Sequence, residues 1–227
     1  MCFSATASFT AAAVLIPAGV YCLKRSNQID TCYWGLAIFP LFFGMQQLLE
    51  GGVWLALQQG EEGIARGFAL GFLLFSHVIW LGWVAYSSYL TESSFWRKRL
   101  FLVMVVIGIL FGAAMYLPLL HKSSWLGLSI VNHSIYYDLQ LVSDAYVSQR
   151  IVTLVYAGII LVPLVLSSGM YHRALGGLIF LSGAVTIAFF VWAFVSVWCY
   201  FAAIISLYIF IVINRSVQVE NARSMTH

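Results

Sequence analysis

Long apolar runs separated by short clusters of charged residues constrain the fold of this chain more than any other feature. Of its 227 residues, 62% are hydrophobic and 8% are charged. A soluble globular domain has about a quarter of its residues charged, so this composition is typical of a protein embedded in a membrane. The sequence therefore predicts an all-α membrane protein.

Seven of the apolar runs have the length of about 20 residues that a helix needs to cross roughly 30 Å of hydrocarbon. No charged residue separates the sixth run from the seventh. No internal repeat or linker interrupts the series, so we expect residues 1–227 to form a single domain of seven transmembrane helices. The predicted spans are Phe9–Leu23, Tyr33–Leu57, Gly67–Leu90, Leu100–Leu120, Ile151–Ser167, Ala174–Val191 and Val195–Asn214.

The basic residues predict the orientation of these spans, because Lys and Arg concentrate in the cytoplasmic loops of membrane proteins. Eight of the eleven basic residues fall in the first, third and fifth loops and in the tail, and three fall in the alternate loops. We therefore expect the N-terminus outside, the C-terminus in the cytoplasm and residues 215–227 as a cytoplasmic tail. The net charge of +3 reflects this cytoplasmic excess and does not indicate nucleic-acid binding.

Two ionisable residues, Glu50 and His77, lie inside predicted spans. Such a group costs about 3 kcal/mol or more in hydrocarbon, so it normally has a function. Glu50 lies roughly 10 Å and His77 roughly 15 Å from the outer surface, at 1.5 Å per helical residue. A short loop joins their two helices, which must be antiparallel neighbours. We therefore expect Glu50 and His77 to face each other in a polar pocket that opens to the outside.

Other polar and aromatic side chains follow the same helical faces. The two glutamines precede Glu50 by three and four residues, and a tryptophan follows it after four, which places them close to one face. On the next span a serine adjoins His77 and a tryptophan follows. The candidate substrate-binding residues are Gln46, Gln47, Trp54, Trp80, Ser4 and Ser76.

Two segments outside the spans are expected to cover this pocket. Residues 1–8 carry no charge, so they can fold back as an outer plug. Residues 121–150 form the long outer loop, in which polar and apolar residues alternate around Asn132-His133-Ser134. This pattern predicts a short β-hairpin between spans 4 and 5 that acts as a lid, with His133 and Asp138 above the pocket mouth. A surface hairpin with a solvated His and Asp is the simpler alternative.

The opening Met1-Cys2-Phe3-Ser4-Ala5 and the QQxxExxxW stretch from Gln46 to Trp54 resemble an uncharacterised family of bacterial seven-span membrane proteins, a domain of unknown function. The resemblance covers the first two spans by motif and the rest by hydropathy. It implies a multi-pass protein of the bacterial inner (cytoplasmic) membrane, in which the opening motif and Glu50 belong together. It brings no activity with it.

The first functional hypothesis is a membrane-embedded metal-dependent enzyme of the hydrolase type. Cys2, Glu50 and His77 are acceptable ligands for zinc or another transition metal, which would activate a bound water. In catalysis Glu50 would act as base or ligand, His77 as acid or ligand, and Cys2 as ligand or nucleophile.

Two alternatives stay open. Glu50 and His77 could bind protons in a transporter, channel or sensor that couples them to a small solute. They could also form a structural pair that joins two helices. The expected partners are membrane lipids and a small-molecule or lipid ligand, and the sequence does not define an oligomeric state. We expect Cys2 and Cys199 to be free, buried thiols near the outer surface, with a Cys2–Cys199 disulfide as the open alternative. His172 is expected to be a solvated cytoplasmic group.

Overall fold

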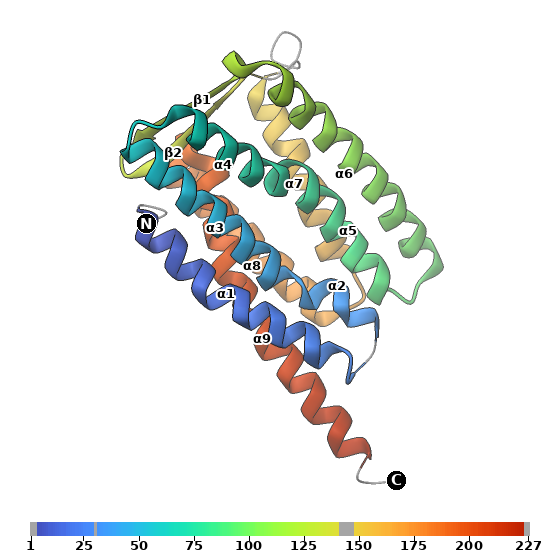
Figure 1. The fold of residues 1–227 in the computed structure, drawn as a ribbon. Coiled ribbons are helices and arrows are strands. Elements are labelled where there is room, and N and C mark those ends of the chain that lie inside the picture. Colours follow the sequence, from blue (N-terminus) through green and yellow to red (C-terminus); the bar gives the residue numbers. More distant parts are fainter. Residues whose placement is uncertain (1–3, 30, 141–147, 225–227) are drawn as a thin grey trace.

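A computed structural model of the protein describes residues 4–29, 31–140 and 148–224, and it arranges them as a bundle of long helices with one β-hairpin (Figure 1). The helical elements are α1 (Ala5–Ser26), η1 (Thr31–Tyr33), α2 (Trp34–Ala37), α3 (Phe39–Gln58), α4 (Glu62–Leu74), η2 (Phe75–Ile79), α5 (Trp80–Thr91), α6 (Phe95–His121), η3 (Ser123–Trp125), α7 (Gln149–Leu166), α8 (Met170–Phe190), η5 (Val191–Ala193) and α9 (Phe194–Ser224). The strands β1 (Leu126–Val131) and β2 (Ser134–Leu139) lie between η3 and α7.

Each predicted span coincides with one helical segment of the bundle. The second span is α2 followed by α3, and the third is α4, η2 and α5 in series. Six segments of the described chain are long and apolar enough to cross a membrane, and the apolar part of α7, Arg150–Leu166, is shorter. The multi-helical apolar bundle predicted from the sequence is therefore confirmed.

Helices α1 and α3 pack closely because a glycine lies at their contact. A Cβ on Gly44 would come within 2.9 Å of the backbone nitrogen of Ile16 in α1. Helix α9 contacts α1, α3 and α8, so the last helix runs against the first ones in the bundle. In Figure 1 its C-terminal part extends beyond the other helices.

The β-hairpin is confirmed, and its turn has a clear local cause. Asn132 and His133, the two turn residues, have φ values of 46° and 57°. Two successive positive φ angles are the mark of a two-residue type I′ turn, in which Asn is favoured. The register pairs Val131 with Ser134 and Leu126 with Leu139.

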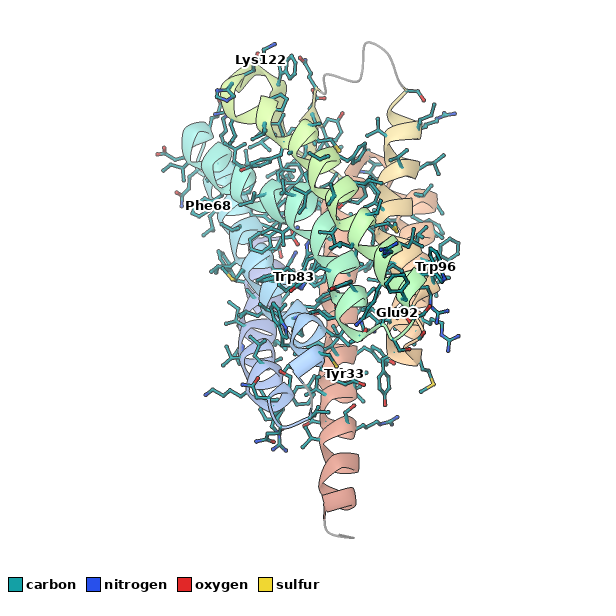
Figure 2. The ribbon with its side chains drawn as sticks, turned by 90° about the vertical axis from the view of Figure 1, so that its right-hand side faces the viewer. Tyr33, Phe68, Trp83, Glu92, Trp96 and Lys122 are labelled. Carbon is teal, nitrogen blue, oxygen red and sulfur yellow. The ribbon has the colours of Figure 1, made fainter. Side chains whose placement is uncertain are left out.

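Different residues mark the two ends of the bundle. The hairpin lies at the end where α1 begins (Figure 1). Ala5 belongs to the same buried cluster as Ile135 and Tyr137 of the hairpin. Figure 2 shows Lys122 at this end and Glu92 with Trp96 toward the other.

Candidate functional site

Glu50 is fully buried in α3, where it faces α9. Ser196 donates from its Oγ to Glu50 Oε1 at 2.5 Å, and Gln47 donates from its Nε2 to Oε2 at 3.0 Å. Ser196 is 146 residues away in the sequence, so the tertiary fold brings this partner to the carboxyl group. Both carboxyl oxygens are satisfied by uncharged donors, a requirement for a polar group kept out of water.

Gln46, one residue before Gln47, forms a second contact in the same buried region. Its Oε1 accepts a hydrogen bond from Trp80 Nε1 at 2.8 Å, and the Trp80 ring stacks on Phe43 with centroids 3.9 Å apart. The Nε2 atom of Gln46 is buried and has no hydrogen-bond partner among the described residues. We call Gln46, Gln47, Glu50, Trp80 and Ser196 the Glu50 cluster.

His77 occupies an irregular point in its helix, the π-helical turn η2. Such turns are rare and occur frequently at functional sites. Its Nδ1 lies 2.8 Å from Ser76 Oγ, and Tyr156 of α7 donates from its hydroxyl to the Ser76 carbonyl at 2.5 Å. A Cβ on Gly112 would overlap the His77 carbonyl oxygen, so the absence of a side chain there lets α6 pack directly on the turn.

A cavity of about 490 Å³ lies between the hairpin, α6, α7, η5 and α9. Its aromatic lining comes from β2, α7, η5 and α9, and Asp138 lies in its lining from β2. We call this space the hairpin cavity; it is lined by His77, Met115, Val131, Ile135, Tyr136, Tyr137, Asp138, Leu139, Val152, Thr153, Tyr156, Trp192, Ala193, Phe194, Val195, Trp198 and Cys199.

Cys199 connects the hairpin cavity to the Glu50 cluster. It is a free cysteine, it lines the cavity, and it follows Ser196 by three residues on α9, close to the same helical face. Glu50 itself does not line the cavity.

The structure gives the predicted site residues separate surroundings. Among the described residues, Glu50 and His77 share no hydrogen bond or ion pair: the first faces Ser196, and the second lies against Ser76 and the cavity. Trp54 is buried in the cluster that contains Cys199 and Tyr137.

The opening segment is described only in part. Ser4 is the N-cap of α1, where its Oγ accepts a hydrogen bond from the backbone nitrogen of Ala7 at 3.2 Å, and Ala5–Ser8 already belong to the helix. Ser8 is fully buried. Cys2 lies outside the described residues, so the plug stays a prediction.

No group of three His, Cys, Asp or Glu side chains that could hold a metal ion exists within 4–29, 31–140 and 148–224. Glu50 and His77 are therefore not joined by a third described ligand. A metal site built on both would need a ligand from outside these residues, and Cys2 is the one that the sequence predicts.

Sequence reasoning missed four residues of this region: Ser196, Cys199, Tyr156 and Trp198. They come from α7 and α9, whose spans showed no charged residue inside. A serine and a cysteine three positions apart on one face of the last span were the available signal.

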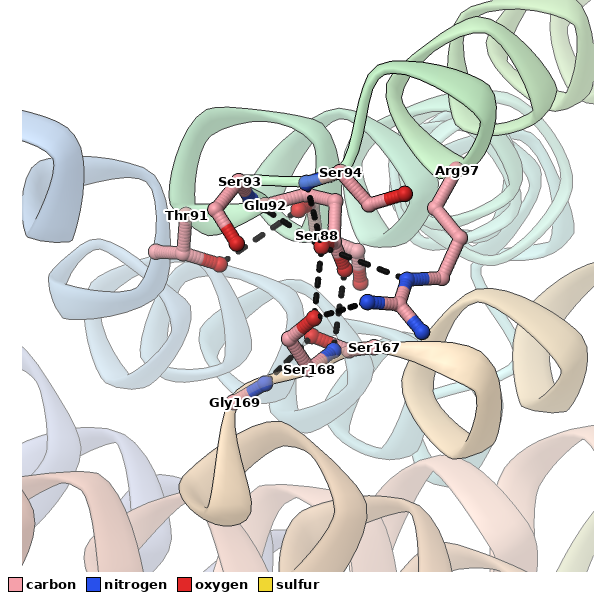
Figure 3. A network of polar contacts seen from close by, with 9 residues as sticks. All are labelled: Ser88, Thr91, Glu92, Ser93, Ser94, Arg97, Ser167, Ser168 and Gly169. Carbon is pink, nitrogen blue, oxygen red and sulfur yellow. Dashed lines mark hydrogen bonds and ion pairs between the residues drawn. The ribbon is translucent and has the colours of Figure 1, made fainter.

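A second polar cluster, at the other end of the bundle, is centred on Glu92 (Figure 3). Its Oε1 accepts hydrogen bonds from the Ser93 nitrogen at 3.0 Å, the Ser94 nitrogen at 2.9 Å and Ser168 Oγ at 2.6 Å. Its Oε2 accepts one from the Ser168 nitrogen at 2.9 Å, and Arg97 Nε lies 3.3 Å from Oε1. We call these five residues the Glu92 cluster.

Glu92 joins two loops that are distant in the sequence, the one before α6 and the one before α8. Burial raises the pKa of this carboxyl group, but the hydrogen bonds from Ser168 and Ser94 and the charge of Arg97 outweigh it, and the pKa falls to about 2. The ionised carboxylate therefore stabilises the connection between the loops.

The expectation that His172 is solvated was wrong. Its side chain is 2% exposed, and its Nε2 lies 3.3 Å from Ser87 Oγ. The adjoining Arg173 suggested a loop, but α8 begins at Met170, and its first turn packs His172 against α5.

Comparison with known proteins identifies the family. The model of DUF6629, a family of unknown function, matches residues 1–224, and the chain belongs to this family. No curated protein and no solved structure matches the chain.

Proposed function

We propose that this member of DUF6629 is a multi-pass membrane protein that binds a small organic solute in the hairpin cavity and acts as a transporter or sensor of that solute. The observation that supports the proposal is the cavity itself. Its volume of about 490 Å³ is in the range of sites for small molecules, and such sites are mostly apolar with a few polar groups.

The Glu50 cluster gives the bound solute a way to influence the helices. Cys199 and Ser196 lie three residues apart on α9; the first lines the cavity, and the second donates to the Glu50 carboxyl group. A solute that displaces α9 alters the contact between α9 and α3. In a membrane with the hairpin end outside, the solute would enter from the exterior.

A paired substitution tests the cavity as a binding site. Met115 of α6 lines the hairpin cavity, whereas Met104 of the same helix does not. Replacing Met115 by Trp fills part of the cavity, and replacing Met104 by Trp adds the same side chain elsewhere. We expect some solutes of a thermal-shift library to raise the Tm of the wild type and of Met104→Trp but not of Met115→Trp. An identical response of the two variants to every solute would refute the proposal.

A thiol enzyme is a second candidate, and it is favoured by the position of Cys199. A nucleophile is activated by a neighbouring base, and Cys199 lies at the wall of the cavity, three residues along α9 from the serine that donates to the Glu50 carboxyl group. In such an enzyme the thiol proton would pass to Glu50 while the sulfur attacks the carbonyl of an acyl ester. The tetrahedral intermediate would then collapse to the thioester, breaking the bond to the ester oxygen, and the departing alcohol would take the proton back from Glu50. Mass spectrometry after exposure to activated acyl esters would show the adduct on Cys199, with the buried Cys22 as the control.

The metal-dependent hydrolase remains a proposal that depends on Cys2. Metal analysis of the purified wild type beside Cys2→Ala, Glu50→Gln and His77→Ala tests it directly. About one equivalent of zinc that is lost in all three variants would establish a site formed by these ligands. A metal content that is the same in all four proteins would rule out that site.

A further inference from the structure

The lining of the hairpin cavity has a chemical bias that points to one class of ligand. Among the described residues of the lining, Asp138 is the only Asp, Glu, Lys or Arg side chain. Six aromatic side chains surround the same space, namely Tyr136, Tyr137, Tyr156, Trp192, Phe194 and Trp198. Aromatic faces carry negative potential and attract cations, so the six aromatic side chains and the Asp138 carboxylate all favour a positively charged ligand.

The aromatic residues on the α7 and α9 side form a connected wall. Tyr156 and Trp198 meet with ring centroids 5.9 Å apart, and Phe194 and Trp198 with centroids 4.9 Å apart. His77 adjoins this wall, with its ring centroid 6.2 Å from that of Tyr156.

The polar atoms of this wall are already engaged. The Trp198 indole nitrogen donates to the Ile179 carbonyl at 3.2 Å, and the Tyr156 hydroxyl donates to the Ser76 carbonyl. What Trp198 and Tyr156 offer a ligand is therefore ring surface rather than a hydrogen bond. A ligand that depends on strong hydrogen-bond donors, such as a phosphate or carboxylate, has no Lys or Arg to meet it in the described lining.

The hairpin supplies the negative charge. Asp138 is exposed, and it pairs across the hairpin with Gly127, whose missing side chain leaves the carboxylate room. The Tyr136 hydroxyl lies 3.5 Å from Asp138 Oδ1, so an aromatic ring and a carboxylate lie next to each other on one face of β2.

We propose that the ligand of the hairpin cavity is an organic cation, a quaternary ammonium or protonated amine with an apolar body, held between the aromatic wall and Asp138. This inference rests on the proposed function, because it names the class of solute that the cavity binds. The shared chemistry covers both a free amine and the ammonium headgroup of a lipid.

An isosteric pair of ligands isolates the contribution of the charge. Choline hexyl ether and the same molecule with carbon in place of the ammonium nitrogen have the same shape and differ in charge. Isothermal titration of the full chain in a maltoside detergent, corrected with protein-free micelles, gives both affinities. We expect the cation to bind at least tenfold more tightly, from cation–π attraction combined with the carboxylate charge.

Matched variants locate the binding to the cavity. Asp138→Asn should weaken the cation by about fivefold and leave the neutral isostere unchanged, whereas Glu61→Gln, an exposed acid outside the cavity, should change neither. Trp192→Leu should weaken the cation by about threefold or more, and Trp125→Leu, outside the lining, should not. An unchanged Tm shows that each variant is folded.

The outcomes separate this inference from the proposed function. Equal affinity for the two isosteres, combined with loss of both in Met115→Trp, overturns the cation and leaves the cavity as a site for neutral solutes. Binding of the cation that survives Met115→Trp and Asp138→Asn places it elsewhere and overturns the inference. If neither isostere binds, the cation is wrong, and the solute library on Met115→Trp and Met104→Trp still decides whether the cavity binds anything.

A lipid source is distinguished by a final arm. Adding phospholipid with a trimethylammonium headgroup to the micelles should compete with choline hexyl ether if the cavity admits a lipid headgroup. Phospholipid with a glycerol headgroup is the control. Competition by the first alone supports a headgroup site, and competition by neither supports a free amine.

Discussion

Replacing Glu92 by Gln is expected to destabilise the end of the bundle that lies opposite the hairpin. The folded protein lowers the pKa of this carboxyl group from 4.5 to about 2. One pKa unit corresponds to about 1.4 kcal/mol, so the ionised form contributes about 3 kcal/mol to folding, as an upper value. Gln keeps one acceptor oxygen and loses the charge, and we therefore expect a loss of about 2 kcal/mol at pH 7.

The pH dependence of this effect has a defined sign. Because the folded pKa lies below the unfolded one, the contribution of Glu92 is fully present above about pH 4.5 and is lost as the pH falls toward 2. The wild type should thus become less stable across this window, and Glu92→Gln should lack this part of the dependence. The two proteins should approach each other in stability at the acidic end.

Thermal unfolding in detergent is measured between pH 3 and pH 7, with the folded fraction read from the recovery of protein in size-exclusion chromatography. These curves give the stability difference between the two proteins at pH 7 and its dependence on pH. Glu61→Gln serves as the control, because Glu61 is exposed and its side chain makes no capping hydrogen bond. A Tm for Glu92→Gln at pH 7 that equals that of the wild type would refute the reasoning. So would a stability difference that stays constant from pH 7 to pH 3.

Three smaller predictions concern packing and turn geometry. Gly112→Ala should lower stability by about 1–3 kcal/mol in thermal unfolding, because its Cβ overlaps the His77 carbonyl, whereas Gly158→Ala, with open space around it, should not. Ser196→Ala should cost about 1 kcal/mol in the same assay, the size expected for a lost hydrogen bond between two apolar helices, and an unchanged Tm would mean that water or another group replaces Ser196 at Glu50. His133→Val should destabilise the hairpin and His133→Gly should not, because residue 133 has a φ of 57°, which glycine adopts readily and a β-branched residue does not. Proteolysis rates at the hairpin report the difference, and equal rates for the two variants would contradict the turn assignment.

The sequence by itself determined the helical segments and the hairpin, because both depend on residues that are close together in the chain. A run of about 20 apolar residues forms a helix in hydrocarbon whatever its neighbours are. Polar and apolar residues alternate on both sides of Asn132-His133, as in two paired strands. Asn favours the positive φ that a two-residue type I′ turn requires, so the hairpin also has a local cause. The burial of Glu50 and His77 inside the bundle was also predicted, because an ionisable side chain in an apolar span is costly to expose to hydrocarbon.

The tertiary structure alone decided which side chains these two residues face. Position along the chain sets the depth of Glu50 but not the rotation of α3, and its partner Ser196 lies 146 residues away on α9. The π-helical turn at His77 carries no local sequence mark, and the packing of Gly112 against its carbonyl depends on α6.

Glu92 is a second residue whose partners could not be predicted from the sequence. In the sequence it is one acid in a polar loop, and the fold buries it against Ser168 of a different loop. Hydrophobic length and periodicity act within one helix, whereas the polar partners, the cavity and its aromatic wall arise only when helices distant in the sequence are packed together. That packing depends on all the contacting side chains at once, and it is why the site required the three-dimensional structure.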